Sequence, residues 1–233
     1  MSGSEPLDAP AVVLSPDRSA LPPDQAEARA RVGRALRRLG HKLVGHHATV
    51  AQLDALTDDI DRQAAAIAGN EERVRVIERP TGDWGPAPAS GEAMFSYDER
   101  PFSGRSSPWG LDLDVVRDSD EAVAVVTLDS AHEGAPGRSH GGIVAALFDD
   151  VFGFVLTINE QPAFTGELTV RYERGVPLHV PLECRARLTE RDGRKMYMTA
   201  ELTGADDAGE TVVYCRARAI FIAILPETFG RGA

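Results

Sequence analysis

The stretch that decides the fold is SHGGIVAALFDD, residues 139–150. A His-Gly-Gly turn opens an apolar run that continues to residue 158, and the first charged residues within it are Asp149 and Asp150. Apolar residues point in nearly every direction around a helix of this composition, so the run predicts a buried helix. An ionised carboxylate in such a helix is costly without a partner or a chemical task. The two carboxylates are therefore candidate functional groups.

Strand-like segments flank this helix on both sides. Apolar and polar residues alternate over 184–188 and 196–202, and the Asp192-Gly193 turn between them predicts a β-hairpin. Further strands are predicted at residues 111–116, 122–128, 168–172 and 211–224. An antiparallel sheet curved around the central helix would bury all these apolar faces. The sequence therefore predicts an α+β domain of that architecture.

The first third of the chain predicts a helical extension. Two stripes of apolar residues recur there at helical spacing: Val32, Leu36, Leu39 and Leu43, then Val50, Leu53, Leu56 and Ile60. Two short amphipathic helices cannot bury their stripes alone, so we expect them to pack on the sheet, on each other or on a partner chain. A basic run in the same segment fits a solvated face or contact with phosphate or an acidic partner. It comprises Arg29, Arg31, Arg34, Arg37 and Arg38.

These patterns divide the chain into five parts. We predict a flexible tail at 1–23, the helical extension at 24–70, a proline-containing linker at 71–90, the sheet-and-helix domain at 91–226 and a C-terminal tail at 227–233.

A longer motif surrounds the central helix. Gly137-x-x-His140-Gly141-Gly142 is followed by Asp149, nine positions after the histidine, and then by Thr165, by L-x-V-x-Y-x-R-x-V-P-L over 168–178 and by Gly193-Arg194-Lys195. Over residues 90–225 the sequence thus resembles the hotdog-fold acyl-CoA thioesterases, in particular the phenylacetyl-CoA-thioesterase-like branch. The resemblance implies a hotdog fold, hydrolysis of an acyl-CoA thioester, and a homodimer or a dimer of dimers.

The His-Gly-Gly turn is suited to polarise a carbonyl group. The first turn of a helix offers backbone N–H groups that lack intrahelical partners and carry partial positive charge, and glycine lets a substrate approach closely. The Gly142 N–H is the predicted donor to the thioester oxygen, with Gly141 beside it. His140 is expected to position the turn or to contact the thioester.

Asp149 is the predicted attacking group, acting as a nucleophile or as a general base on water. Asp150 is the alternative carboxylate, or else an ion-paired neighbour. The resemblance gives Thr165 the role of assisting the carboxylate. Asp149 follows Gly142 by seven residues, ~10 Å along a helix that rises ~1.5 Å per residue, which is too far from a carbonyl held at the helix start. We therefore expect a two-fold dimer in which each chain completes the other's site.

The phosphates of coenzyme A require local basic groups on a chain whose formal net charge is −11. Four residues are candidates, of which the resemblance favours the last two: Arg171, Arg174, Arg194 and Lys195. Glu173 stands where some relatives carry a basic residue, so nucleotide contacts are expected to differ there. Pocket depth, and with it acyl preference, would depend on aromatic side chains of the central helix, such as Phe148, Phe152 and Phe154.

Composition limits the other interpretations. No cofactor or metal is expected, because the CoA thioester is the substrate and His46-His47 has no further ligands arranged around it. Cys184 and Cys215 fall in predicted strands and are expected to be buried thiols. The acidity argues against nucleic acid as a partner. Without a tract of about 20 apolar residues or a signal-peptide pattern, we expect a soluble, cytoplasmic protein with no membrane span.

Two other functions fit parts of the pattern. One is a hotdog protein that binds acyl-CoA without turnover, as a sensor or carrier-associated module. Only the presence of Asp149 together with Thr165 favours the enzyme over this binding protein. Hydration of an enoyl-CoA is disfavoured, because no paired Asp and His stand along a strand-to-helix loop.

Overall fold

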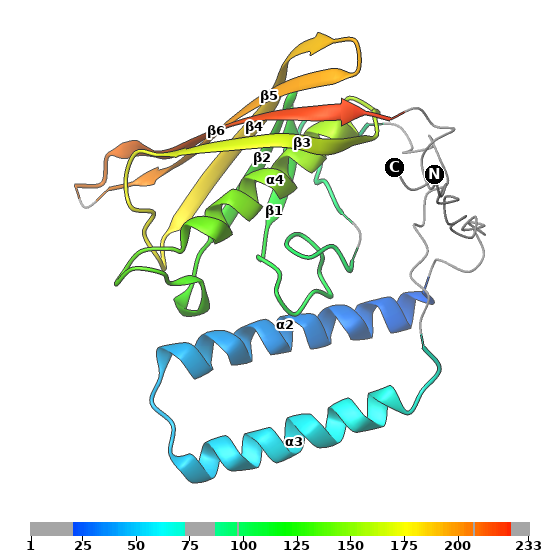
Figure 1. Ribbon diagram of the computed structural model, residues 1–233, viewed down its shortest axis with the longest axis vertical. Coiled ribbons are helices and arrows are strands. Elements are labelled where there is room, and N and C mark those ends of the chain that lie inside the picture. The colour runs from blue at the N-terminus through cyan, green and yellow to red at the C-terminus, as the bar shows by residue number, and fades with distance from the viewer. Residues whose placement is uncertain (1–20, 73–86, 97, 207, 225–233) are drawn as a thin grey trace, which may run out of the picture.

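The computed structural model describes residues 21–72, 87–96, 98–206 and 208–224. The tails predicted at 1–23 and 227–233 and the linker predicted at 71–90 lie wholly or mostly outside the described residues. The elements follow one another as α2 (Pro23–Gly45), α3 (Val50–Ala68), β1 (Asp114–Asp118), β2 (Glu121–Thr127), η1 (Ser130–His132), α4 (Gly141–Ile158), β3 (Ala163–Tyr172), β4 (Pro181–Asp192), β5 (Lys195–Ala205) and β6 (Thr211–Ala223) (Figure 1).

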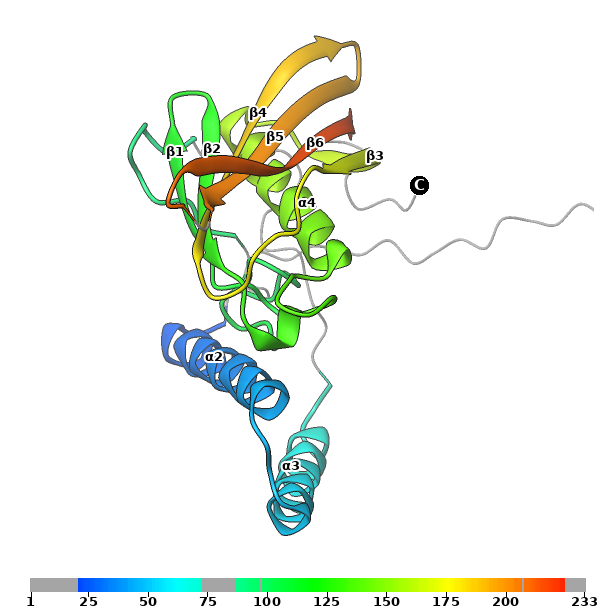
Figure 2. The same ribbon diagram turned by 90° about the vertical axis from the view of Figure 1, so that its left-hand side faces the viewer.

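The sheet has six antiparallel strands in the order β1-β2-β4-β5-β6-β3 and curves around α4 (Figures 1 and 2). This is the α+β hotdog architecture that the sequence predicts. The six predicted strands all form, although the first begins at Asp114 rather than at residue 111. β3 lies at one edge of the sheet and pairs only with β6 among the described residues.

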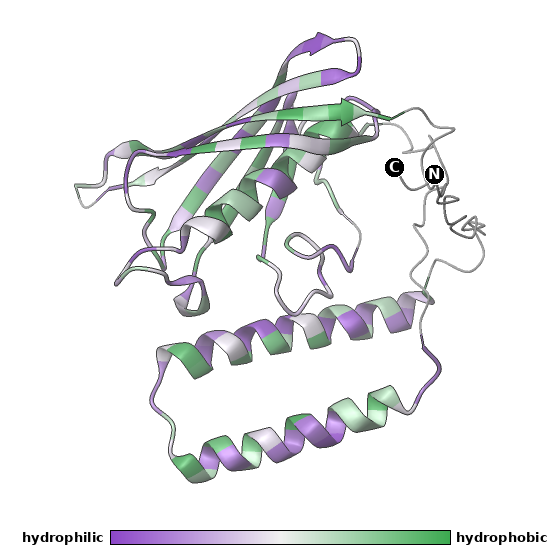
Figure 3. Ribbon diagram, in the orientation of Figure 1, coloured by the Kyte–Doolittle hydropathy of each residue, from purple (hydrophilic) through white to green (hydrophobic). Residues whose placement is uncertain are grey.

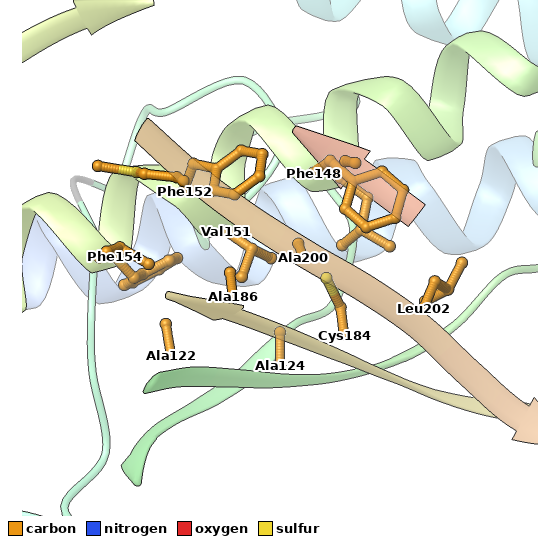
Figure 4. Packing of buried hydrophobic residues seen from close by; sticks show 14 of the residues in the cluster. Ala122, Ala124, Phe148, Val151, Phe152, Phe154, Cys184, Ala186, Ala200 and Leu202 are labelled. Carbon is orange, nitrogen blue, oxygen red and sulfur yellow. The ribbon is translucent and has the colours of Figure 1, made fainter. Parts of the chain in front are cut away.

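The core forms where large side chains of α4 meet small side chains of the sheet. Phe148 and Phe152 are fully buried, and Figure 4 shows them among sheet residues that are mostly small: Ala122, Ala124, Cys184, Ala186 and Ala200. A small residue on the sheet leaves room for a ring on the helix, so the two layers interdigitate at close-packed density. These two phenylalanines therefore fill the core rather than line an open pocket.

α4 has the length and apolar character of a membrane-spanning helix, and no other helix of the described part of the chain does. The sheet explains this composition, because 56% of the 18-residue helix is buried inside the domain. A core helix wrapped on several sides needs apolar residues around most of its circumference.

α2 docks on the domain through an unexpected face. Its buried residues are Ala30, Gly33 and Arg37 rather than the Val32–Leu43 stripe. Arg37 is 6% exposed; its guanidinium donates to the Ser107 carbonyl at 2.6 Å and pairs with Asp112 at 2.5 Å. At Gly33 an added Cβ would lie 2.6 Å from backbone carbon of the facing loop, so only glycine permits this approach.

α3 contributes no buried residue. A capping box formed by Thr49 and Gln52 starts the helix, which therefore has a local reason to form. Figure 3 shows apolar positions on both α2 and α3, and Figures 1 and 2 show α3 set off from α2 and from the sheet. The expectation that both stripes are covered is not met within a single chain.

Candidate active site

The His-Gly-Gly turn forms the start of α4. His140 is the N-cap residue, and its Nδ1 accepts a hydrogen bond from the Gly142 N–H at 3.0 Å. The Gly142 N–H, the predicted oxyanion donor, is therefore engaged by an imidazole in this structure. His140 is exposed, so its ring has room to rotate and release that N–H to another acceptor.

Tyr172 at the end of β3 supports the same turn. Its hydroxyl donates to the Gly141 carbonyl at 2.7 Å, and its ring lies so close that an added Cβ on Gly141 would be 3.3 Å from it. On the other side, the Ser139 N–H donates to the Val176 carbonyl at 2.9 Å. Tyr172 and the segment that follows β3 thus hold the turn, which gives its N–H groups a fixed direction.

Asp149 and Thr165 are brought together by α4 and β3. The Thr165 hydroxyl donates to Asp149 Oδ1 at 2.7 Å, a short hydrogen bond to a carboxylate. The pairing of β3 with β6 shifts register between Thr165 and Glu167. Such a bulge redirects the side chains beside it, and here it leaves Thr165 next to the helix. The Asp149 side chain is partly exposed and thus accessible to a substrate or to water.

Asp150 is occupied elsewhere. It is 5% exposed, and its Oδ1 lies 2.6 Å from the Arg100 Nε. Arg100 also lies over the Phe154 ring, 5.9 Å from its centroid, and its guanidinium rests on Gly153, where an added Cβ would meet it. Of the two alternatives for Asp150, the geometry favours the ion-paired neighbour, which leaves Asp149 as the accessible carboxylate.

The two halves of the predicted site do not share a cavity within one chain. An open depression of about 600 Å³ adjoins the helix start and is lined by Ser139, His140, Gly141, Gly142, Val144, Tyr172, Glu173, Arg174, Gly175 and Val176. Neither Asp149 nor Thr165 lines it. Seven residues of β3 separate Thr165 from Tyr172, ~23 Å at ~3.3 Å per residue. The separation expected from the helix rise is thus present along the strand as well.

The four basic candidates fall into two groups at opposite ends of β3. Arg174 lines the depression, and the nearby Arg171 has an 82% exposed side chain. Arg194 and Lys195 instead follow the β4–β5 turn, where the Arg194 Nε donates to the Ala223 carbonyl at 2.9 Å, beside the start of β3. A single chain therefore does not gather all four.

Glu173 also lines the depression but does not add a free negative charge. Its carboxylate pairs with Arg216 of β6 at 2.5 Å. The departure from the family pattern is thus balanced by a cation on the neighbouring strand.

Two histidines that the sequence analysis did not single out connect α2 to the turn. The ring of His41 on α2 packs edge-on against that of His132, with centroids 4.7 Å apart, and the His132 carbonyl accepts from the His140 N–H at 2.8 Å. Burial, together with His41, lowers the pKa of His132 to about 4, against the opposing charges of Asp129 and Asp112. His132 is therefore neutral near pH 7. No periodic pattern marks either residue, so sequence spacing alone could not have found the pair.

The cysteines behave as expected from their strand positions. Both Cys184 and Cys215 are free and buried. Burial raises the pKa of the Cys184 thiol far above its usual range and that of Cys215 to about 11. Neither is a nucleophile near neutral pH. Within the described residues no group of three or more His, Cys, Asp or Glu side chains is arranged to hold a metal ion.

Comparison with known proteins agrees with this fold and motif. Residues 137–211, which span the turn, α4 and the strands up to β6, match the family model of the thioesterase superfamily. A thioesterase superfamily protein of known crystal structure superposes with a TM-score of 0.67 at 23% identity, over 88% of this chain and 98% of that one. The resemblance to hotdog thioesterases stated from the sequence is confirmed.

Among curated proteins, the chain is similar to acyl-coenzyme A thioesterases. It is 32% identical to THEM4 of Mus musculus over 95 residues, 41% of this chain and 40% of the relative. It is 26% identical to THEM4 of Bos taurus over 120 residues, 51% of this chain and 48% of the relative. It is 27% identical to THEM5 of Homo sapiens over 90 residues. The chain thus matches less than half the length of these relatives.

Proposed function

We propose that this protein is a thioesterase that hydrolyses acyl-CoA to a free carboxylic acid and coenzyme A. The observation that carries the proposal is the Thr165–Asp149 hydrogen bond, which places an accessible carboxylate on a helix whose start carries the His-Gly-Gly turn. The names of the curated relatives support the same substrate class.

The site is proposed to form between two copies of the chain. Along β3, an edge strand, the Asp149–Thr165 pair lies near one end and the Gly141–Gly142 depression near the other. A two-fold axis that sets the central helices antiparallel would bring the acid of one chain to the glycine turn of its partner. It would also gather Arg194 and Lys195 of one chain with Arg171 and Arg174 of the other around the phosphates of coenzyme A.

In the proposed reaction the thioester oxygen replaces the His140 imidazole as acceptor of the Gly142 N–H. The Asp149 carboxylate takes a proton from a water molecule as that water's oxygen bonds to the carbonyl carbon, and Thr165 holds the carboxylate. The tetrahedral oxyanion then collapses, the C–S bond breaks, and the proton passes to the departing thiolate. Direct attack by Asp149, giving a mixed anhydride that water cleaves, yields the same products. No metal or cofactor takes part in either route.

Release of free thiol from a panel of acyl-CoAs tests the proposal. We expect turnover by the native chain and a loss of 10²–10⁴-fold, roughly the contribution of a positioned general base, for Asp149→Asn. Asp120→Asn, at the exposed β1–β2 turn, is the matched control and should keep full turnover. Full turnover by Asp149→Asn would refute the assigned role. Calorimetric binding of acyl-CoA with no thiol release from the native chain would instead show the binding module.

A further inference from the structure

We infer that the α2–α3 hairpin is an interface between two copies of this chain, in which α3 of one copy packs on α2 of the other. The exposed stripes of this hairpin include none of the proposed site residues, and the inference does not depend on the proposed function.

α3 needs a partner that its own chain does not supply. None of its 19 residues is buried, and apolar side chains at helical spacing are open to solvent: Leu53 at 38%, Ile60 at 46% and Ile67 at 69% exposure. Isolated helices of this length are marginal in water, because tertiary packing of an apolar stripe supplies most helix stability. We therefore expect another surface to pack on the apolar stripe of α3.

α2 offers a matching stripe on a face beside the one that docks on the domain. Val32, Leu36 and Leu43 are 55%, 42% and 47% exposed, whereas Ala30, Gly33 and Arg37 dock on the hotdog domain. At 100° per residue the centres of these two sets lie ~110° apart around the helix. Docking to the domain therefore covers a neighbouring face and leaves Val32, Leu36 and Leu43 partly exposed, while Leu39 is half-buried.

The two stripes of one chain do not pack on each other in this structure, and the linker between the helices is extended at both ends. His46, which ends α2, and Thr49, which precedes α3, both have extended backbone. Residues 46–49 can span ~13 Å in that conformation at ~3.3 Å per residue. Packed helices lie ~8–10 Å apart, so an extended linker is long enough for the separated arrangement of the two helices. In Figures 1 and 2 α3 runs antiparallel to α2 without resting on it.

The opposite charges of α2 and α3 indicate that a second copy of the hairpin covers these exposed stripes. Apart from the buried Arg37, α2 is basic, with Arg29, Arg31, Arg34, Arg38 and Lys42 against Asp24 and Glu27. α3 is acidic, with Asp54, Asp58, Asp59 and Asp61 against Arg62. Each helix therefore complements the other in charge as well as in apolar stripe, and a two-fold pair satisfies both helices of both chains. An anionic membrane surface would attract α2 but repel α3.

Cysteine cross-linking of the full chain tests the arrangement. Leu36 and Ile60 each lie near the middle of their helix, so they approach one another whichever way the two helices run. Both are exposed in the single chain, and the native Cys184 and Cys215 are buried and unreactive. We expect Leu36→Cys/Ile60→Cys to give a covalent dimer on mild oxidation. A mixture of the two single variants should give a covalent heterodimer.

The control pairs Leu36→Cys with Asp58→Cys, because Asp58 lies on the opposite side of α3 from Ile60. This pair should stay largely unlinked. A bond within one chain in the double variant, seen as a monomer with no free introduced thiol, would overturn the inference. The absence of any disulfide bond between the two introduced cysteines would also overturn the inference. If the chain then sediments with phosphatidylserine-containing vesicles, the occupant of the hairpin is a membrane surface and not a second copy. Thiol release from acyl-CoA is measured separately, so failure here is distinct from failure of the proposed function.

Discussion

The hydroxyl of Thr165 gives the clearest test of how Asp149 is held. Thr165→Val keeps the shape of the side chain but removes the donor to the carboxylate. A hydrogen bond to a charged group contributes roughly 1.5–3 kcal/mol, so we expect kcat to fall about 10- to 100-fold with little change in KM. Thr165→Ser restores the donor and should recover most of the rate. Equal activity of the Val and Ser variants in steady-state assays would show that the contact has no catalytic weight.

His132 makes the stability of the fold depend on pH in a defined window. Burial places its native pKa at about 4, below the 6.5 of an unburied imidazole. Between these two values the unfolded chain binds a proton that the native chain does not. This contribution to stability is therefore complete above pH 6.5 and is lost progressively as the pH falls towards 4.

Urea unfolding at pH 7, 5.5 and 4.5 measures this effect. His132→Gln retains a side-chain acceptor for the Asp129 N–H but does not titrate, so its free energy of unfolding should fall less steeply than that of the native chain. Parallel pH dependences would assign the acid sensitivity to other groups, such as Asp129, whose pKa is lowered chiefly by the hydrogen bond from the Ser130 N–H.

Among whole elements, the docking of α2 rests on one close backbone approach. Gly33→Ala would drive a methyl group into the backbone at Ser106 and Arg105, whereas nothing lies within 4 Å of a Cβ at Gly40. Replacing a helix-interior glycine by alanine favours the helix by roughly 0.5–1 kcal/mol. Overpacking costs about 1–3 kcal/mol, so Gly33→Ala should lower stability while Gly40→Ala raises it. Thermal unfolding of the two variants checks the opposite signs.

The sequence correctly predicts the elements in which the buried residues recur at the regular spacing of a strand or a helix. Alternation marks the β4–β5 hairpin and an all-round apolar run marks α4, and both form where expected. The docking face of α2 was not predictable in this way, because it includes a buried arginine, Arg37, whose partners Ser107 and Asp112 lie 70 and 75 residues further along the chain. An apolar stripe identifies a face that must be covered but not which surface covers it.

The candidate site divides in the same manner. Asp149 follows from motif spacing and Thr165 from the family resemblance, and the structure brings them into hydrogen-bond contact. The role of Asp150 could not be resolved from sequence, because its partner Arg100 lies in an irregular loop that has no pattern. The engagement of the Gly142 N–H by His140 was equally hidden, since it depends on the rotamer of one side chain.

For the whole molecule, the decisive question is whether each site draws on two chains. Asp149→Asn removes the proposed base, and Gly142→Pro removes the proposed oxyanion donor in the first turn of α4. Circular dichroism of Gly142→Pro checks that the fold is retained, because proline also restricts Gly141. Each variant alone should lose at least about 99% of the native activity. In an equal mixture, mixed dimers pair the intact Gly142 of one chain with the intact Asp149 of the other, so one of their two sites is complete. About a quarter of the native activity should return, because half of the dimers are mixed and half of their sites are intact.

Sites built within one chain would give the opposite result, since every site in the mixture would then carry one of the two substitutions. The mixing must allow subunit exchange, which refolding the two variants together from urea ensures. A native-plus-variant mixture prepared in the same way calibrates the recovery. If the co-refolded variants form mixed dimers, confirmed by differential tags, but release no thiol, the donor and the acid belong to the same chain. The ~10 Å between Gly142 and Asp149 along α4 would then have to be closed by movement of the substrate or the helix rather than by a partner.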